Sequence, residues 1–100
     1  MIPAVILLHP DDNVVVCRRT VTAGEHVVIE GMVDFVAAAG VEIGHKLARW
    51  ALPSGARVIK YGAPIGSTTA PVSAGEWVHL HNMKSDYISA HTRAATGEER

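Results

Sequence analysis

The sequence predicts a single, mainly β domain built of short strands. Valine is abundant, glycine and proline recur at short intervals, and no stretch longer than about fifteen residues keeps a strong helical period. One hundred residues, 48% of them hydrophobic and 19% charged, are enough for one domain with a modest core. We therefore expect short strands joined by tight turns.

Seven segments have the β-branched or alternating apolar residues that are typical of strands. The first two, at 4–8 and 13–18, are nearly continuous apolar runs, and the later ones begin after glycine- or proline-containing turns. Two further stretches, 31–40 and 45–52, are predicted to form short helical turns. The expected strands are 4–8, 13–18, 26–30, 41–48, 57–61, 64–68 and 76–82.

A short motif, glycine followed three residues later by valine, occurs three times and predicts a turn that leads into a strand. Gly24, Gly55 and Gly75 are expected to adopt a positive φ, and the valine after each to enter the core. The spacings of 31 and 20 residues are unequal, which indicates a recurring hairpin motif and not a solenoid. The residues expected in the core are Val14, Val16, Val27, Val58, Ile65, Val78 and Leu80.

Composition and charge exclude several classes of protein. The net charge is −1 with no basic run, which argues against nucleic acid as a partner. The apolar run AVILL at 4–8 is too short to span a bilayer, and the first residues lack the basic region of a secretory signal. A lone cysteine, Cys17, cannot form an internal disulfide and is expected to be buried as a small hydrophobe. We expect a cytoplasmic domain at 1–91 with a flexible tail at 92–100.

Histidine is unusually frequent, and two of the six histidines are one residue apart in GEWVHLHN (75–82). Strand alternation would place Trp77, His79 and His81 on one face. Two imidazoles on one face make a workable pair of ligands for a divalent transition metal, but such a site needs three or four ligands. The pair is thus open to three interpretations: a metal site, a catalytic surface, or the polar face of a small barrel.

Two lysines accompany the histidines in short glycine-containing segments, GHK (44–46) and KYG (60–62). Lys46 or Lys60 would suit a carboxylate, and a neutral imidazole such as that of His45 can exchange a proton near pH 7. The structural alternative is that both lysines are solvated at strand ends. No phosphate-binding loop, nucleophile elbow or Cys-x-x-Cys motif is present. Because so small a domain rarely encloses a whole active site, the remaining groups are expected to come from elsewhere.

Five segments occur in a fixed order over about residues 7–88: HPDDNVVVC, TAGEHV, GHKLA, SGARVIKYGAPIGSTTAPVSAGEWVHLHN and MKSDYI. This ordered series resembles the N-terminal SAF-type (β-clip) domain of the altronate and galactarate dehydratase family, the UxaA family. The resemblance implies a small β-clip fold and a lyase that eliminates water or sulfite from a hydroxy acid. It also implies a large catalytic subunit as partner, and a divalent metal, expected to be iron in the dehydratases, at a site shared with or held by that subunit.

The resemblance also implies a set of site residues, although which residues hold the metal stays open. Since the sequence stops at residue 100, it resembles the free-standing small subunit of the sulfolactate sulfo-lyase type, inactive alone. Residues 32–43 depart from the Pro-containing turn that is usual before GHK, which bears on substrate identity more than on fold. The implied catalytic residues are His45, His79 and His81, and the implied substrate-binding residues are Lys46, Lys60 and Asn82.

Two other functions are compatible with the sequence. SAF-like domains also serve as non-catalytic binding or assembly modules, and a fold alone does not fix a function. An isolated β domain could also form homo-oligomers through an apolar face.

For the subunit hypothesis, Trp50 or Trp77 is expected to pack against the large subunit, because tryptophan is enriched at interface hot spots.

Overall fold

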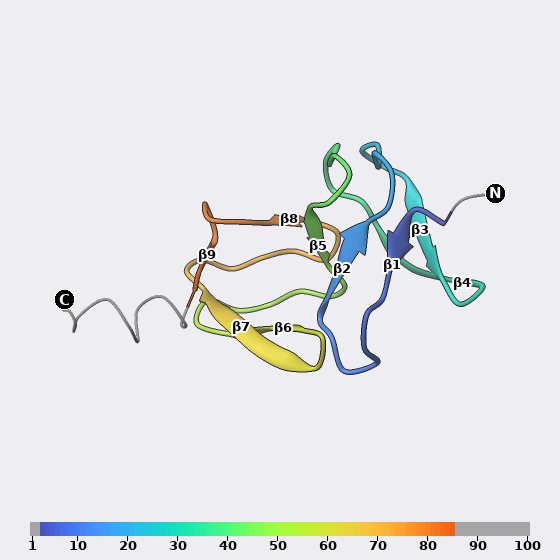
Figure 1. The fold of residues 1–100 in the computed structure, drawn as a ribbon. Coiled ribbons are helices and arrows are strands. Elements are labelled where there is room, and N and C mark those ends of the chain that lie inside the picture. The colour runs from blue at the N-terminus through green and yellow to red at the C-terminus, as the bar shows by residue number, and fades with distance from the viewer. Residues whose placement is uncertain (1–2, 86–100) are drawn as a thin grey trace, which may run out of the picture.

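The computed structural model describes residues 3–85, and these form short β-strands and no helix (Figure 1). The predicted mainly β class is confirmed. No helix of the described residues could cross a membrane. The strands are β1 (Val5–Ile6), β2 (Val14–Cys17), β3 (His26–Ile29), β4 (Met32–Val36), β5 (Lys46–Ala48), β6 (Arg57–Lys60), β7 (Ala63–Thr68), β8 (Trp77–Val78) and β9 (Met83–Lys84).

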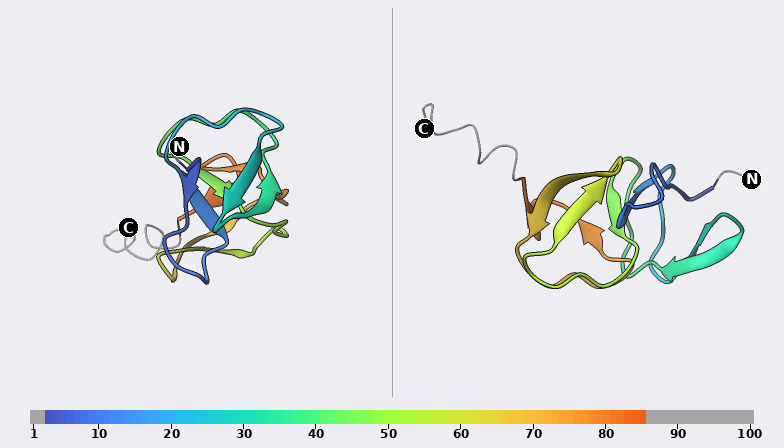
Figure 2. Two further views of the ribbon diagram at one scale, coloured as in Figure 1. Left: turned by 90° about the vertical axis from the view of Figure 1, so that its right-hand side faces the viewer. Right: turned by 90° about the horizontal axis from the view of Figure 1, so that it is seen from below.

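The described strands form three antiparallel sheets, one of which is central. The central, four-stranded sheet has the order β1-β2-β5-β8. The hairpin β3–β4 is a two-stranded sheet of its own, and β6, β7 and β9 form the third sheet. Figures 1 and 2 show the two hairpins, β3–β4 and β6–β7, on different sides of the central sheet and towards opposite ends of the molecule.

The two halves of the domain repeat the same backbone course. Adding 31 to a residue number in 17–47 gives its counterpart in 48–78. In the first hairpin Val27 pairs with Phe35 just before a β-bulge. In the second hairpin the counterparts Val58 and Gly66 pair just before the same bulge. The sequence predicts three of the recurring turns, at Gly24, Gly55 and Gly75, but the repeat is a whole half-domain and not only a hairpin motif.

The hairpin turns of the two halves are also equivalent. Glu30 and Gly31 have φ of 52° and 82°, and Tyr61 and Gly62 have φ of 59° and 73°. Positive φ at both central residues is the type I′ geometry that suits the right-handed twist of a two-residue hairpin. The expected positive φ is also confirmed at the three glycines of the recurring motif, Gly24, Gly55 and Gly75.

Two apolar clusters lie on the two faces of the central sheet. Alternation along β2 sends Val15 into the first cluster and Val14 into the second. Hairpin β3–β4 covers the first cluster through Val27, and β6–β7 covers the second through Val58. The predicted burial of four core residues is confirmed. These are Val14, Val27, Val58 and Val78.

The two predicted helical turns are wrong. Residues 31–40 contain β4, and residues 45–52 contain β5. β4 pairs with β3, and β5 lies between β2 and β8 with a ladder on each side. Strand pairing of these short segments therefore outweighs their local helical spacing, which is a weak signal at such lengths.

The predicted strand at 76–82 is also too long. The strand ends at Val78, and a turn follows, so Leu80 is 75% exposed and its predicted burial is wrong. Val16 and Ile65 are only half-buried. Of the predicted strand 41–48, only Lys46–Ala48 is a strand.

Cys17 is buried in the first cluster, as expected. Burial raises the pKa of its thiol, the nearby Glu25 raises it further, and Arg19 opposes both. A raised pKa keeps the group a thiol, which is the less reactive form. The predicted flexible tail at 92–100 lies outside the described residues.

Two polar side chains before β2 hold the second hairpin in place. Asp12 is fully buried, and its carboxylate accepts the backbone N–H groups of Tyr61 (3.0 Å) and Gly62 (2.8 Å). The side chain of Asn13 donates to the carbonyl of Arg57 and accepts from the N–H of Ile59, both at 2.8 Å. The polar segment HPDDN is therefore a structural clamp on β6 and its turn.

Asp12→Ala should destabilise the fold strongly. The substitution leaves two backbone N–H groups without their charged acceptor, and such bonds contribute about 1.5–3 kcal/mol each, so we expect a loss of about 3 kcal/mol in the free energy of unfolding. Urea denaturation measures this loss. Asp11→Ala, at a side chain that is 83% exposed, is the matched control and should change stability by no more than about 0.5 kcal/mol. Equal stability of both variants would contradict the clamp.

Candidate functional site

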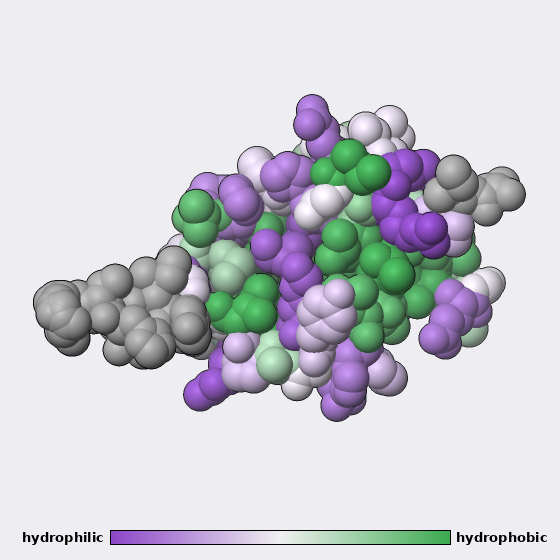
Figure 3. Space-filling model, in the orientation of Figure 1, coloured by the Kyte–Doolittle hydropathy of each residue, from purple (hydrophilic) through white to green (hydrophobic). Residues whose placement is uncertain are grey.

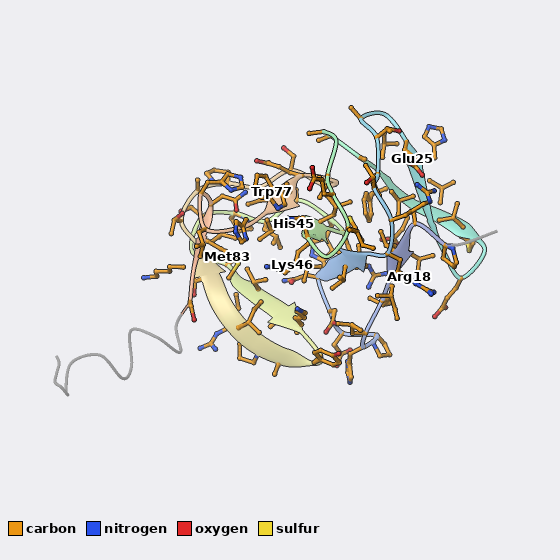
Figure 4. The ribbon with its side chains drawn as sticks, turned by 45° about the horizontal axis from the view of Figure 1, so that its top comes forward. Arg18, Glu25, His45, Lys46, Trp77 and Met83 are labelled. Atoms are coloured by element: carbon orange, nitrogen blue, oxygen red, sulfur yellow. The ribbon has the colours of Figure 1, made fainter. Side chains whose placement is uncertain are left out.

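Three imidazoles surround the indole ring of Trp77. The ring centroid of His79 lies 5.3 Å from that of Trp77 in a stacked arrangement, and that of His81 lies at 4.8 Å with a tilt of 39°. His45 meets Trp77 edge-on at 5.3 Å and also contacts His79 edge-on at 5.5 Å. Figure 4 shows His45 and Trp77 side by side. The structure thus brings together the three predicted catalytic histidines, and we call these four residues the histidine–tryptophan cluster.

The pairing of β5 with β8 joins the two parts of this cluster. Leu47 of β5 lies opposite Trp77 of β8, so both side chains are on the same face of the central sheet. His45 is two residues before Leu47 and therefore shares that face. Segments 32 residues apart in the sequence meet because two adjacent strands pair.

A turn, and not a longer strand, brings His81 back to Trp77. The carbonyl of His79 accepts the backbone N–H groups of Asn82 (3.0 Å) and Met83 (2.9 Å). The side chain of Asn82 accepts the N–H of His79 at 2.9 Å and donates to the carbonyl of Trp77 at 2.8 Å. The predicted grouping of His79 and His81 is therefore found, although the predicted strand alternation explains only His79.

Asn82 acts in the structure as a positioning residue. Its side chain is buried, and both ends of its amide bind the backbone of the turn. The turn in turn carries His79 and His81. The amide therefore fixes where the two imidazoles lie, and a direct contact of Asn82 with substrate stays a prediction.

A hydrogen bond defines the protonation of His45. The indole Nε1–H of Trp77 donates to Nδ1 of His45 at 3.3 Å. Because Nδ1 accepts this bond, the single proton of the neutral ring is on Nε2. His45 thus presents an N–H donor on the side away from Trp77.

The pKa of His79 is lowered from its ordinary value. Partial burial disfavours the charged imidazolium, and the positive charge of Lys46, then His45 and His81, acts in the same direction. Within residues 3–85, no carboxylate forms an ion pair with any of the three histidines of the cluster. His79 is therefore a neutral imidazole at neutral pH, the form that can accept a proton.

The two predicted lysines lie beside the cluster and not inside it. Alternation along β5 puts Lys46 on the face of Ala48, opposite to that of Trp77. Burial lowers the pKa of Lys46, and the charge of Lys60 lowers it further. Neither lysine forms an ion pair with another described residue. The two lysines are therefore close to each other without a described counter-ion, and Lys46 is close enough to His79 to lower its pKa.

The described residues do not make a metal site by themselves. Within residues 3–85, no three His, Cys, Asp or Glu side chains are grouped as metal ligands. In the cluster, Nδ1 of His45 is already bonded to Trp77. An anionic ligand, which would complete a typical site, is also missing among the ion pairs of these histidines.

An open pocket of about 280 Å³ adjoins the cluster. Its wall includes His45, Trp77 and Glu42. Sequence reasoning placed Trp77 on one face with His79 and His81 and named Trp50 or Trp77 as an interface residue, but it did not include Trp77 among the site residues. The signal was its position in GEWVHLHN, two residues before His79, because that spacing places the two side chains on one face.

Comparison with known proteins places this chain in a defined family. Residues 3–86 match the family described as "Altronate/galactarate dehydratase SAF domain". Altronate dehydratase from Bacillus subtilis is 33% identical over 81 residues, and that from Escherichia coli is 37% identical over 81 residues. Each alignment covers 81% of this chain but 16% of the relative, so the chain spans about a sixth of these enzymes.

Smaller relatives are similar over about half of the chain. The alpha subunit of (2R)-sulfolactate sulfo-lyase from Paracoccus pantotrophus is 45% identical over 49 residues. That alignment covers 49% of this chain and 73% of the relative. The name of this relative implies an enzyme of more than one subunit.

Lys46→Met should raise the pKa of His79. Removing the lysine charge removes one of the causes that disfavour the imidazolium, so the pKa moves up towards the ordinary value of about 6.5. Titration of the His79 ring by NMR measures the shift. Lys84→Met removes an exposed charge that is not a cause of the shift and is the matched control. An unchanged pKa in the Lys46 variant would show that the lysine charge does not contribute to the shift.

Trp77→Phe should release the tautomer of His45. Phenylalanine keeps an aromatic ring but has no N–H donor, so Nδ1 of His45 loses its bond and the neutral ring becomes a mixture of tautomers. The ring ¹⁵N shifts of His45 report this change directly. Trp50→Phe, at the other tryptophan, should leave them unaltered. A wild-type ring already protonated on Nδ1 would contradict the assignment.

Proposed function

The chain belongs to the SAF-domain family of altronate and galactarate dehydratases, and from this premise we propose that it is the small subunit of a hydro-lyase. The reaction is the elimination of water, or of sulfite, from a small hydroxy acid. The observation that carries the proposal is the histidine–tryptophan cluster, in which three imidazoles meet on one indole beside an open pocket.

Elimination next to a carboxylate needs a base, a proton donor for the leaving group and positive charge at the substrate carboxylate. His79, neutral because of its lowered pKa, is the proposed base. His45, with its proton on Nε2, is the proposed donor. Lys46 and Lys60 supply positive charge that no described carboxylate neutralises. His81 contacts Trp77 at a tilt and completes the surface offered to substrate.

The proposal assigns the divalent metal to the partner. The described residues do not fit a metal by themselves, since no three ligand side chains are grouped. A metal such as iron would supply the electrophile for the developing enolate when it is held by the large subunit. The small subunit then contributes imidazoles and lysines at the boundary between the subunits.

Exposed apolar side chains support a contact with that large subunit. Trp50 is 47% exposed and carries the guanidinium of Arg49 over its ring at 5.1 Å. Figure 3 shows apolar side chains gathered over β1 and β2 on one face of the molecule. Further exposed apolar side chains on hairpin β3–β4 are Val28, Met32, Val33 and Val36.

We propose a cytoplasmic complex, since the lone cysteine is a free, buried thiol.

A non-catalytic binding module is the second candidate. It is favoured by the span of the chain, which is 16% of the altronate dehydratases, and by the lack of a metal-ligand group in residues 3–85. In that case the cluster would bind a hydroxy acid or the partner without taking part in proton transfer.

The test is co-expression with a candidate large subunit of the altronate dehydratase type, followed by co-purification and metal analysis. The subunit proposal expects a stable complex that eliminates water or sulfite from a hydroxy acid, with activity only when both chains are present. A chain that purifies alone, with full activity in the large subunit by itself, would leave the binding module as the function.

Single substitutions His45→Gln, His79→Gln and His81→Gln should each reduce kcat/KM of the complex by about 10²-fold or more. This is the lower end of what a general acid or base contributes. His9→Gln, at a histidine outside the cluster, is the matched control and should leave kcat/KM near that of the wild type. Normal rates in all three variants, with full metal occupancy, would refute the catalytic role of the cluster.

A further inference from the structure

The internal repeat extends to the strands before each half. Cys17 and Ala48 are counterparts, and they pair with Val5 and Val14 respectively. Val5 of β1 is therefore the counterpart of Val14 of β2. The residues just before these strands correspond in the same way, so Pro3 and Ala4 take the places of Asp12 and Asn13.

Backbone hydrogen bonds support this correspondence. The N–H of Arg18 donates to the carbonyl of Ala4 at 2.8 Å. The N–H of Arg49, the counterpart of Arg18, donates to the carbonyl of Asn13 at 2.9 Å. The backbone before β1 thus lies against the first half as the backbone before β2 lies against the second.

The side chains at these places are different. In the second half, the Asp12 carboxylate binds both N–H groups of the Tyr61–Gly62 turn. In the first half, proline and alanine offer no polar side chain, and no described residue accepts a hydrogen bond from the N–H groups of Glu30 or Gly31. The first turn therefore has the same donors as the second without their acceptor.

A pocket of about 350 Å³ lies at this place. Its wall includes Pro3, Ala4 and the turn residues Glu30 and Gly31. Val28, the counterpart of Ile59, is also in the wall. The space that Asp12 and Asn13 occupy in the second half is thus open in the first.

We propose that this pocket binds an aspartate side chain from an extended segment of another polypeptide, with the carboxylate on the N–H groups of Glu30 and Gly31. A protein segment fits better than a free acid, because in the second half the backbone of Asn13 also donates to Ile59 at 3.3 Å. The binding mode copies an interaction that this molecule already makes with itself.

The charges around the pocket are compatible with such a ligand. Asp12 forms no ion pair with any described residue, so backbone donors alone hold a carboxylate in the second half. In the pocket wall, the positive charge of Arg19 is matched by Glu25, to which it is paired. Glu30 is exposed, and its carboxylate can turn to solvent. The ligand therefore needs the donors of the turn and no additional cation.

The first experiment uses the full chain and a peptide with the sequence HPDDNV, that of residues 9–14, blocked at both ends. Titration into ¹⁵N-labelled protein should move the amide signals of Glu30 and Gly31 with saturation. A matched peptide with the Asp-Asn pair replaced by Ala-Ala should bind at least about tenfold more weakly. Absence of a shift at both amides would overturn the proposal.

Sodium acetate in the same titration separates a protein ligand from a free carboxylate. Acetate should move the two amides only at concentrations far above those of the peptide, because it lacks the backbone contacts of an extended segment. If acetate alone bound as tightly as the peptide, the polypeptide ligand would be refuted and the pocket would be a site for small acids.

The second experiment fills the pocket from within. The double variant Pro3→Asp/Ala4→Asn places the second half's own pair of side chains in the first half. Hydrogen exchange at Glu30 and Gly31 should slow by about tenfold or more, and peptide binding should be lost. Pro3→Ala, which adds no carboxylate, is the control and should bind the peptide like the wild type. Unchanged exchange and unchanged peptide binding in a folded double variant would contradict the proposal.

Discussion

The need to cover both faces of the central sheet determines the rest of this structure. Neighbouring residues on its strands, such as Leu47 and Ala48, enter different apolar clusters, so neither face can be left in water. Strands of two to four residues are too short to be stable alone. Each face is therefore covered by one hairpin, and the two hairpins are equivalent parts of the repeated half-domain.

The candidate site lies where this repetition ends. The counterpart of Trp77 is Lys46, which lies in β5 with a strand on each side. β8 is the last strand of the central sheet, so one side of Trp77 is not covered by a further strand of the described residues. The chain instead turns at 79–82, and the imidazoles of His79 and His81 come to lie on the indole. The edge strand β8 therefore presents Trp77 together with the imidazoles of His79 and His81.

Sequence alone predicts the parts that local chemistry determines. A glycine of the turn motif, such as Gly24, predicts a positive φ, and the valine three residues later predicts a buried position. The ordered motifs predict the family. The turn that exposes Leu80 is not predictable in this way, because it depends on the buried amide of Asn82 bonding to the backbone of Trp77. Strand alternation explains why His79 lies beside Trp77, but a turn brings His81 there. The sequence alone does not distinguish this turn from a longer strand.

The repeat also separates what the fold requires from what it does not. Gly31 and Gly62 are the same residue because both hairpin turns need positive φ, and Val27 and Val58 are the same because both fill a core. Glu76 accepts the backbone N–H of Ser73 in its own turn, whereas its counterpart His45 accepts the indole N–H of Trp77, so one backbone position has a structural residue in one half and a site residue in the other. His45 and the open pocket beside Pro3 and Ala4 are thus differences between the halves that the shared backbone course does not require. Function in this domain is therefore to be sought where its two halves are unlike.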